Sequence, residues 1–335
     1  MKRLQKGGAR VVLSFAVAFI LHGIAAAGAL GPVQPGWAPD GEKYNSNALW
    51  VAITGISNNA AFLAINVPGT IPSNVCSLFF VPSLNDNQEW SRIIPCAPGR
   101  TNLVVTNLPA AQGFFMLSSP IRLGFDQQTL DRNDDGSTGL VPLPFTINFL
   151  NNSESALYVN NNGNVTFDQA SYYYTPGNLA STKVKMIAPF WADVDTRSPS
   201  PGAVEYGTNN VDGHSAFGVD WVNVGYYATH ANKLLSCQLV MIDRSDNAPG
   251  DFDMEFNYSQ VQWEAGSASG GSNGLGGYSA RAGYSDGITA YELSGSGVNG
   301  AFLDTNTVTG LIYNCLRSSI PGRYVFLFRD GQPLP

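Results

Sequence analysis

Two groups of acidic and amide side chains have the types and spacing to bind a cation. In the first, Asp131, Asn133 and Asp135 are spaced two apart and precede Gly136, as in the first half of an EF-hand loop. The twelfth position of such a loop would be Pro142, which cannot supply the bidentate carboxylate, so an EF-hand is excluded. The three residues are therefore either ligands of a looser calcium loop or members of a solvated turn, which Asp, Asn and Gly also favour.

The second group is Asp193 and Asp195, which lie on one face of a predicted strand together with Arg197. These carboxylates could hold calcium, or act as a general acid and base if one pKa were raised. Arg197 is a counter-charge that would keep both carboxylates ionised, which favours a structural Asp–Arg network over catalysis. If a metal binds at either group, we expect calcium, because the ligands are carboxylates and amides and His and Cys are few.

A further acidic face is predicted on the strand that spans Gly250–Tyr258. Its apolar face consists of Phe252, Met254, Phe256 and Tyr258. Its polar face consists of Asp251, Asp253, Glu255 and Asn257. The apolar register then shifts to Val261 and Trp263, which predicts a bulge near Ser259 and Gln260. If this strand neighbours that of Asp193, a bridging metal would explain such unneutralised charge.

Motifs for nucleophilic or phosphate chemistry are missing from the sequence. There is no Gly-x-Ser-x-Gly elbow, and beyond residue 27 only His214 and His230 could act as imidazole bases. The glycines at 270–277 precede no predicted helix and no Lys-Ser or Lys-Thr pair. We therefore expect a protein that is not an enzyme and requires no cofactor.

The first residues have the order of a secretory signal peptide. Lys2, Arg3, Lys6 and Arg10 precede an apolar run over 11–24 and the small residues 25–27, which predicts a leader over 1–27 with cleavage between Ala27 and Gly28. The alternative is an uncut membrane anchor, but a span needs roughly 20 apolar residues and this run is shorter. We expect a secreted or surface-exposed product with no stable membrane insertion after cleavage.

The charge of the exported chain argues against polyanionic partners. The whole chain has 18 basic and 25 acidic residues, and four of the basic residues lie in the leader, so the remainder carries a net charge of −11. Nucleic acid and anionic lipid both require basic patches, and we expect neither as a partner.

All four cysteines, Cys76, Cys96, Cys237 and Cys315, lie beyond the leader, where the setting is oxidising. Sequence alone allows three pairings. If there are two domains, the simplest is Cys76 with Cys96 and Cys237 with Cys315. A zinc site is disfavoured because no Cys-x-x-Cys spacing occurs.

The remaining pattern is that of an all-β chain. Short strands are predicted at Leu49–Thr54, Ala61–Val67, Cys76–Val81 and Leu103–Thr106. Beyond them, Val141–Phe149 alternates between apolar and polar residues, and its prolines predict an edge strand. Asn162-Gly163 predicts a hairpin. Two further strands are predicted at Leu234–Ile242, which is apolar on both faces, and at Tyr324–Phe328, which closes the chain. We expect little helix and a β-sandwich over 125–330, preceded by a smaller β-rich domain over 38–124.

Several blocks in this second region resemble the extracellular nidogen-like (NIDO) domain family. They are Leu143–Phe149, Leu157–Phe167, Ile187–Arg197, Val219–Tyr227, Gly250–Glu264 and Gly274–Gly287. The resemblance covers roughly 130–330 and implies non-catalytic cell–matrix adhesion or scaffolding, with an extracellular protein or glycan as ligand. It supplies no known binding residue, and the EGF-like repeats that usually accompany the domain are absent.

Two other functions remain open. A carbohydrate-binding module would use exposed Tyr172–Tyr174 and Tyr226-Tyr227 to stack on sugar rings, although such aromatics are commonly core residues in β proteins. A secreted hydrolase would use Asp193 and Asp195, and would need them in a deep pocket with one raised pKa.

Overall fold

The computed structural model describes residues 16–19, 50–57, 60–67, 75–83, 90–99, 101–107, 113–198 and 202–335. Within these ranges the chain forms strands and one short 3-10 helix, η1 (Ser267–Ser269), and no α-helix. This confirms the all-β prediction. The described part of the chain contains no helix with the length and hydropathy that a membrane crossing needs.

Two antiparallel sheets form the larger part of the structure. The six-stranded sheet has the order β19-β18-β12-β11-β10-β9, and the eight-stranded sheet has the order β21-β20-β17-β16-β15-β14-β8, with β13 paired to β15. The strands of the first are β9 (Val141–Phe149), β10 (Asn152–Asn160), β11 (Asn164–Thr166), β12 (Lys185–Trp191), β18 (Arg281–Asp286) and β19 (Ala290–Glu292). Those of the second are β8 (Gln128–Leu130), β13 (Val194–Asp195), β14 (Val204–Val211), β15 (His214–Tyr226), β16 (His230–Asp243), β17 (Phe252–Val261), β20 (Arg323–Arg329) and β21 (Gln332–Pro333).

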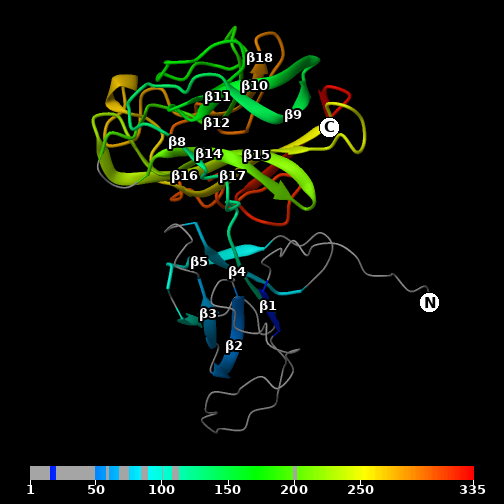
Figure 1. Cartoon of the computed structure of the whole chain (residues 1–335). Helices are drawn as coiled ribbons and strands as arrows, with labels where there is room; N and C mark the ends of the chain where they lie inside the picture. Colours follow the sequence, from blue (N-terminus) through cyan, green and yellow to red (C-terminus); the bar gives the residue numbers. More distant parts are fainter. Residues whose placement is uncertain are drawn as a thin grey trace, which may run out of the picture.

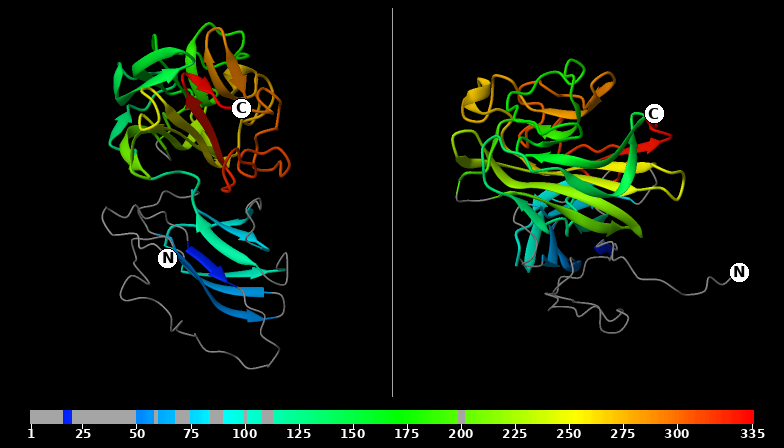
Figure 2. Two further views of the ribbon diagram at one scale, coloured as in Figure 1. Left: turned by 90° about the vertical axis from the view of Figure 1, so that its right-hand side faces the viewer. Right: turned by 45° about the horizontal axis from the view of Figure 1, so that its top comes forward.

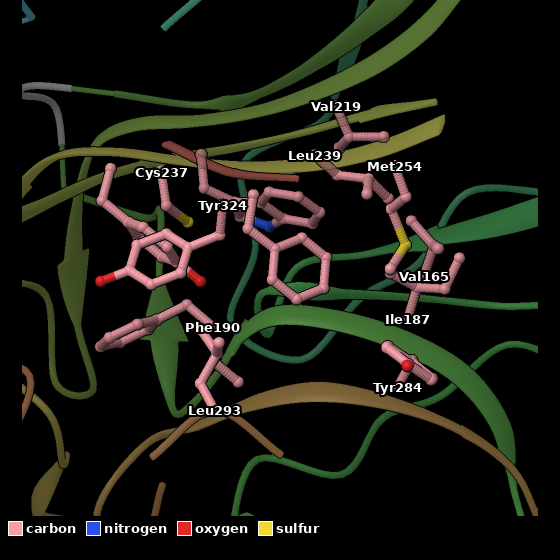
Figure 3. Packing of buried hydrophobic residues seen from close by; sticks show 14 of the residues in the cluster. Val165, Ile187, Phe190, Val219, Cys237, Leu239, Met254, Tyr284, Leu293 and Tyr324 are labelled. Carbon is pink, nitrogen blue, oxygen red and sulfur yellow. The ribbon is translucent and has the colours of Figure 1, made fainter. Parts of the chain in front are cut away.

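The main core fills the space between these two sheets, as a sandwich requires. Figure 3 shows Val219, Leu239 and Met254 of the eight-stranded sheet facing Val165 and Ile187 of the six-stranded sheet. Two buried polar groups tie the layers together. The Tyr258 hydroxyl of β17 donates to the Pro189 carbonyl of β12 at 2.7 Å, and the Trp221 indole of β15 donates to the Asn161 carbonyl at 3.1 Å.

The N-terminal residues form two smaller sheets around a second core. The four-stranded sheet consists of β1 (Ala16–Phe19), β7 (Phe114–Ser118), β4 (Ser77–Val81) and β5 (Ser91–Pro95). The three-stranded sheet consists of β2 (Trp50–Ser57), β3 (Ala60–Asn66) and β6 (Asn102–Thr106). The strands expected near residues 50, 61, 76 and 103 are therefore all present. β1 lies within the predicted leader, whereas the expected cleavage residues Ala27 and Gly28 lie outside the described residues.

The eight-stranded sheet lies between the six-stranded sheet and the N-terminal lobe. Figure 1 shows the N-terminal strands on the outer side of β15–β17, and both views in Figure 2 agree with that order of layers. The chain crosses between the lobes near Pro120. Arg92 of the N-terminal lobe donates to the Ser259 carbonyl at 3.1 Å, which links the lobes directly.

Local features of the strands follow the sequence pattern closely. Cys237 pairs with Tyr258 and Ser236 with Gln260, so Ser259 is the extra residue of the predicted bulge. β10 and β11 pair from Asn160 and Asn164, which confirms the hairpin around Asn162-Gly163. β9 is an edge strand, as its prolines predict.

The structure contains no disulfide among the described cysteines. Cys76 and Cys96 lie across from each other beyond the β4–β5 pair, and the Cys96 N–H donates to the Cys76 carbonyl at 2.8 Å. Cys237 is fully buried in the main core, as Figure 3 shows, and Cys315 lies in the long loop between β19 and β20. Opposed residues of an antiparallel pair are close enough for a disulfide, which suits the predicted Cys76–Cys96 bridge. The Cys237–Cys315 disulfide also remains a prediction.

Candidate functional site

Three carboxylates converge where the chain crosses between the two sheets. Asp134 and Asp135 lie in the turn that connects β8 to β9, and Asp193 lies in the bend between β12 and β13. One carboxylate oxygen from each lies within 4.8 Å of those of the other two. The turn and the bend thus bring together residues that are almost sixty positions apart in the sequence.

The β10–β11 hairpin turn holds both segments in place. The Asn161 side chain donates to the backbone carbonyls of Asp134 and Val194. The Asn162 side chain accepts from the Val194 N–H at 3.0 Å and donates to Asp135 Oδ1 at 2.9 Å. Both asparagines are buried, so their amides are fixed by these contacts. The hairpin turn is therefore a third segment, which holds the two segments that carry the carboxylates against each other.

The surroundings of the cluster shift the pKa values of the nearby carboxyl groups in different directions. Burial raises the pKa of Asp193 to about 7 and that of Asp134 to about 6, and neighbouring carboxylates add to both shifts. Asp195 is also buried, yet hydrogen bonds from the Arg197 side chain and backbone and from the Thr229 N–H lower its pKa. Arg197 forms ion pairs with Asp195 and Asp134, and none of the ion pairs between described residues joins it to Asp193.

Only part of the predicted ligand set is assembled. Asp135 and Asp193 meet, whereas Asp195 is engaged by Arg197 at 2.6 Å and 2.9 Å. Asn133 closes the turn, because its amide donates to the Asp131 carbonyl and accepts from the Gly136 N–H, and the Asp131 side chain is exposed. These contacts support the turn interpretation for Asp131 and Asn133.

Asp134 was missed by the sequence reasoning. The only available signal was the Asp134-Asp135 pair, since the two-residue spacing selects alternate positions and passes over Asp134. Asp193 also lies in a bend instead of within a strand with Asp195, so the two do not share one strand face as expected.

The acidic face of β17 is neutralised by arginines, which overturns the idea of a metal bridge there. Asp253 pairs with Arg244 at 2.8 Å and with Arg329 at 2.6 Å. Glu255 accepts two hydrogen bonds from Arg122, at 2.6 Å and 2.8 Å. This face therefore serves to attach the linker after the N-terminal lobe to the outer side of the sheet.

The same outer face carries a buried carboxyl group on β15. Asp220 lines a hollow with Asp126, Arg132 and Glu205, and its Oδ1 accepts from the Gln238 amide at 2.6 Å. Burial raises the pKa of Asp220 to about 8, with smaller contributions from Glu205 and Asp126 and an opposing one from Gln238. Burial therefore favours the protonated, neutral form of Asp220 in the folded chain.

We expect Asp220→Asn to flatten the pH dependence of stability. Because the folded-state pKa of about 8 exceeds the unfolded value near 4, the folded state binds the extra proton between these limits, and its stabilising effect is lost as pH rises. The asparagine keeps the acceptor for Gln238 and has no proton to lose. Urea unfolding from pH 5 to pH 7 should show that the free energy of unfolding falls less steeply with rising pH in the variant, by up to about 1.4 kcal/mol per pH unit. An unchanged slope would contradict the assignment.

A group of exposed tyrosines, here called the tyrosine patch, lies near one end of the six-stranded sheet. It consists of Tyr172, Tyr173, Tyr174 and Tyr278, which are 62%, 66%, 38% and 64% exposed. Ser269 connects its two segments, because its hydroxyl donates to the Tyr174 carbonyl and its carbonyl accepts from the Tyr278 N–H.

A hollow adjoins this patch and offers both aromatic and polar groups. Tyr173 and Trp191 line it together with Asn178 and Thr182, and the Trp191 indole donates to the Tyr173 carbonyl at 2.8 Å. Tyr226, by contrast, is buried and stacked on His230 at 4.8 Å, so the prediction that it is exposed for sugar stacking is wrong.

Comparison with known proteins gives a consistent family match. A family model described as the Nidogen-like domain matches residues 155–330. The chain is 28% identical over 227 residues to alpha-tectorin of Mus musculus and 27% identical over 227 residues to that of Homo sapiens. Each alignment covers 60% of this chain but 10% of the relative, so the chain spans about a tenth of the length of these relatives. No solved structure matches it.

Proposed function

Because the chain belongs to the nidogen-like domain family, we propose that it is an adhesion or scaffolding protein of the extracellular matrix type. Membership of this family and the similarity to alpha-tectorin support an extracellular location. The proposal extends this to a binding role, in which the nidogen-like region contacts an extracellular protein in the matrix or on a cell surface.

The observation that carries this proposal is the tyrosine patch. Three consecutive tyrosines and Tyr278 expose large amphipathic rings to solvent within the family-matched region. Tyrosine is enriched at protein interfaces, since it buries a large area at little conformational cost and keeps a hydroxyl for hydrogen bonding. The net negative charge of the exported chain suits a protein partner better than a polyanionic one.

A non-catalytic role is part of the proposal. Paired-carboxylate hydrolysis requires two carboxylates that face a substrate with separated pKa values. Asp193 and Asp195 do differ in pKa, but Asp195 is engaged by Arg197 and Thr229. The two hollows described above, one beside Asp220 and one beside Trp191, are lined by neither residue. The contacts of Asp195 leave it engaged with the protein itself, which favours a structural role over catalysis by this pair.

The test is binding of the exported protein to matrix preparations and adhesion of cells to the coated protein. Replacing Tyr172 and Tyr173 together with Ser should lower binding by at least about tenfold, because buried aromatic anchors carry most of the energy of an interface. Ile288→Ser is the matched control, since Ile288 is 90% exposed and lies outside the patch. Equal binding by all three proteins, or an equal loss in the control, would contradict a role for the patch.

Carbohydrate binding is the second candidate, favoured by the hollow beside the patch. Its aromatic rings could stack on a sugar face while Asn178 and Thr182 supply hydrogen bonds. A glycan array with the exported protein separates the two functions. Selective glycan binding that Tyr173→Ser abolishes would identify a lectin, whereas an empty array with retained matrix binding supports the protein ligand.

A further inference from the structure

The Asp193 carboxylate is buried without a hydrogen-bond partner among the described residues. The residue is 1% exposed, and neither of its two carboxylate oxygens accepts a hydrogen bond from the described residues. Oδ2 faces Gly266, where an added Cβ would lie 2.4 Å away, so a larger residue there would cover the carboxylate. A buried carboxylate costs free energy unless it is paired, hydrogen-bonded or bound to a metal. Asp193 therefore needs a partner that the protein itself does not supply.

The other members of the cluster add charge around the same point. Asp134 Oδ1 is also buried without a hydrogen-bond partner among the described residues, while Asp134 Oδ2 pairs with Arg197 at 3.0 Å. Asp135 Oδ1 accepts only from Asn162 among the contacts described above. Arg197 already pairs with Asp195, so the positive charge nearby is smaller than the negative charge of four carboxylates. The imbalance matches a divalent cation.

We propose that Asp134, Asp135 and Asp193 bind one calcium ion. All three ligands are hard oxygen donors, and no His or Cys belongs to the cluster, which disfavours transition metals. Calcium accepts several carboxylates in irregular geometry, whereas magnesium demands near-ideal octahedral geometry and keeps most of its water. Extracellular modules commonly bind calcium with dissociation constants of about 10⁻⁴–10⁻³ M, which is adequate outside the cell.

The position of the site defines what the ion would do. The turn of Asp134 and Asp135 leads from the eight-stranded to the six-stranded sheet, and the bend of Asp193 leads back from the six-stranded to the eight-stranded sheet. One ion would therefore join two opposite crossings between the layers. Because it binds the folded arrangement alone, it would raise the melting temperature.

The experiment uses the exported protein after treatment with a chelator and dialysis. Calcium titration followed by calorimetry should give one site per chain, and millimolar calcium should raise the melting temperature by roughly 2–6 °C. Asp193→Asn should remove both responses. Asp131→Asn is the matched control, because Asp131 belongs to the same turn but is exposed and outside the cluster, and it should keep both.

A second variant and a second metal show whether a lost or retained response is specific to the calcium site. Asp135 is only partly buried, so Asp135→Asn should fold even if Asp193→Asn does not, and it should weaken calcium affinity at least about tenfold. Absence of binding heat and an unchanged melting temperature in the parent would overturn the proposal. So would an equal response to magnesium, or an equal loss in Asp131→Asn.

Discussion

Replacement of Arg122 with Ala is expected to lower the free energy of unfolding by about 3–5 kcal/mol. The guanidinium forms two hydrogen bonds with Glu255, and the Glu255 side chain is 4% exposed. Burial raises the pKa of this carboxyl group, but the stronger combined effect of Arg122, Arg323 and Asn257 leaves it below its usual value. Loss of Arg122 would remove both arginine hydrogen bonds from this buried carboxylate and leave Arg323, at 3.8 Å, as the remaining positive charge. Urea unfolding measures the change.

Two comparisons separate this effect from the loss of any surface arginine. Arg244→Ala removes an ion pair with Asp253 that Arg329 also neutralises, and it should cost no more than about 1 kcal/mol. In a Glu255→Ala background, Arg122→Ala should cost far less than it does alone, since no buried carboxylate remains to be paired. A cost of Arg122→Ala that is the same in both backgrounds would show that the ion pair is not its source.

Gly163→Ala is expected to lower the free energy of unfolding by roughly 2–5 kcal/mol. Gly163 has a φ of +72°, which costs an alanine about 1–2 kcal/mol. An added Cβ would also lie 1.8 Å from the Phe190 carbonyl oxygen, so the hairpin must move away from β12. Thermal and urea unfolding of the purified variant test this.

Gly276→Ala is the matched control for the hairpin variant. Gly276 has a φ of +85°, and an added Cβ would meet nothing within 4 Å. It should therefore show only the backbone cost, about 1–2 kcal/mol. If the two variants were equally destabilised, the contact with Phe190 would contribute nothing.

Local pattern was enough to predict most of the sandwich. The alternation of Phe252, Met254 and Phe256 with acidic residues correctly predicted β17, and the register shift after Tyr258 correctly predicted the bulge at Ser259. These features depend on neighbours in the chain, because side chains alternate along any strand. The edge position of β9 followed in the same way from its prolines.

The pairing of charges depended on residues far away and could not be read from the pattern. Glu255 appeared unneutralised because Arg122 lies 133 positions earlier, in the linker. Asp134 was missed because the direction of a side chain in a turn is set by what the turn packs against, here Asn161. A periodic pattern carries no information on either contact.

The prolines of β9 limit how copies of this protein can associate. β9 forms one edge of the six-stranded sheet, and Pro142 and Pro144 remove two backbone N–H donors from its first half. An edge with such gaps cannot template a continuous ladder with a strand from another chain. Copies of this protein would therefore not associate by strand addition at the first half of β9, and any contact between them would have to form elsewhere on the surface.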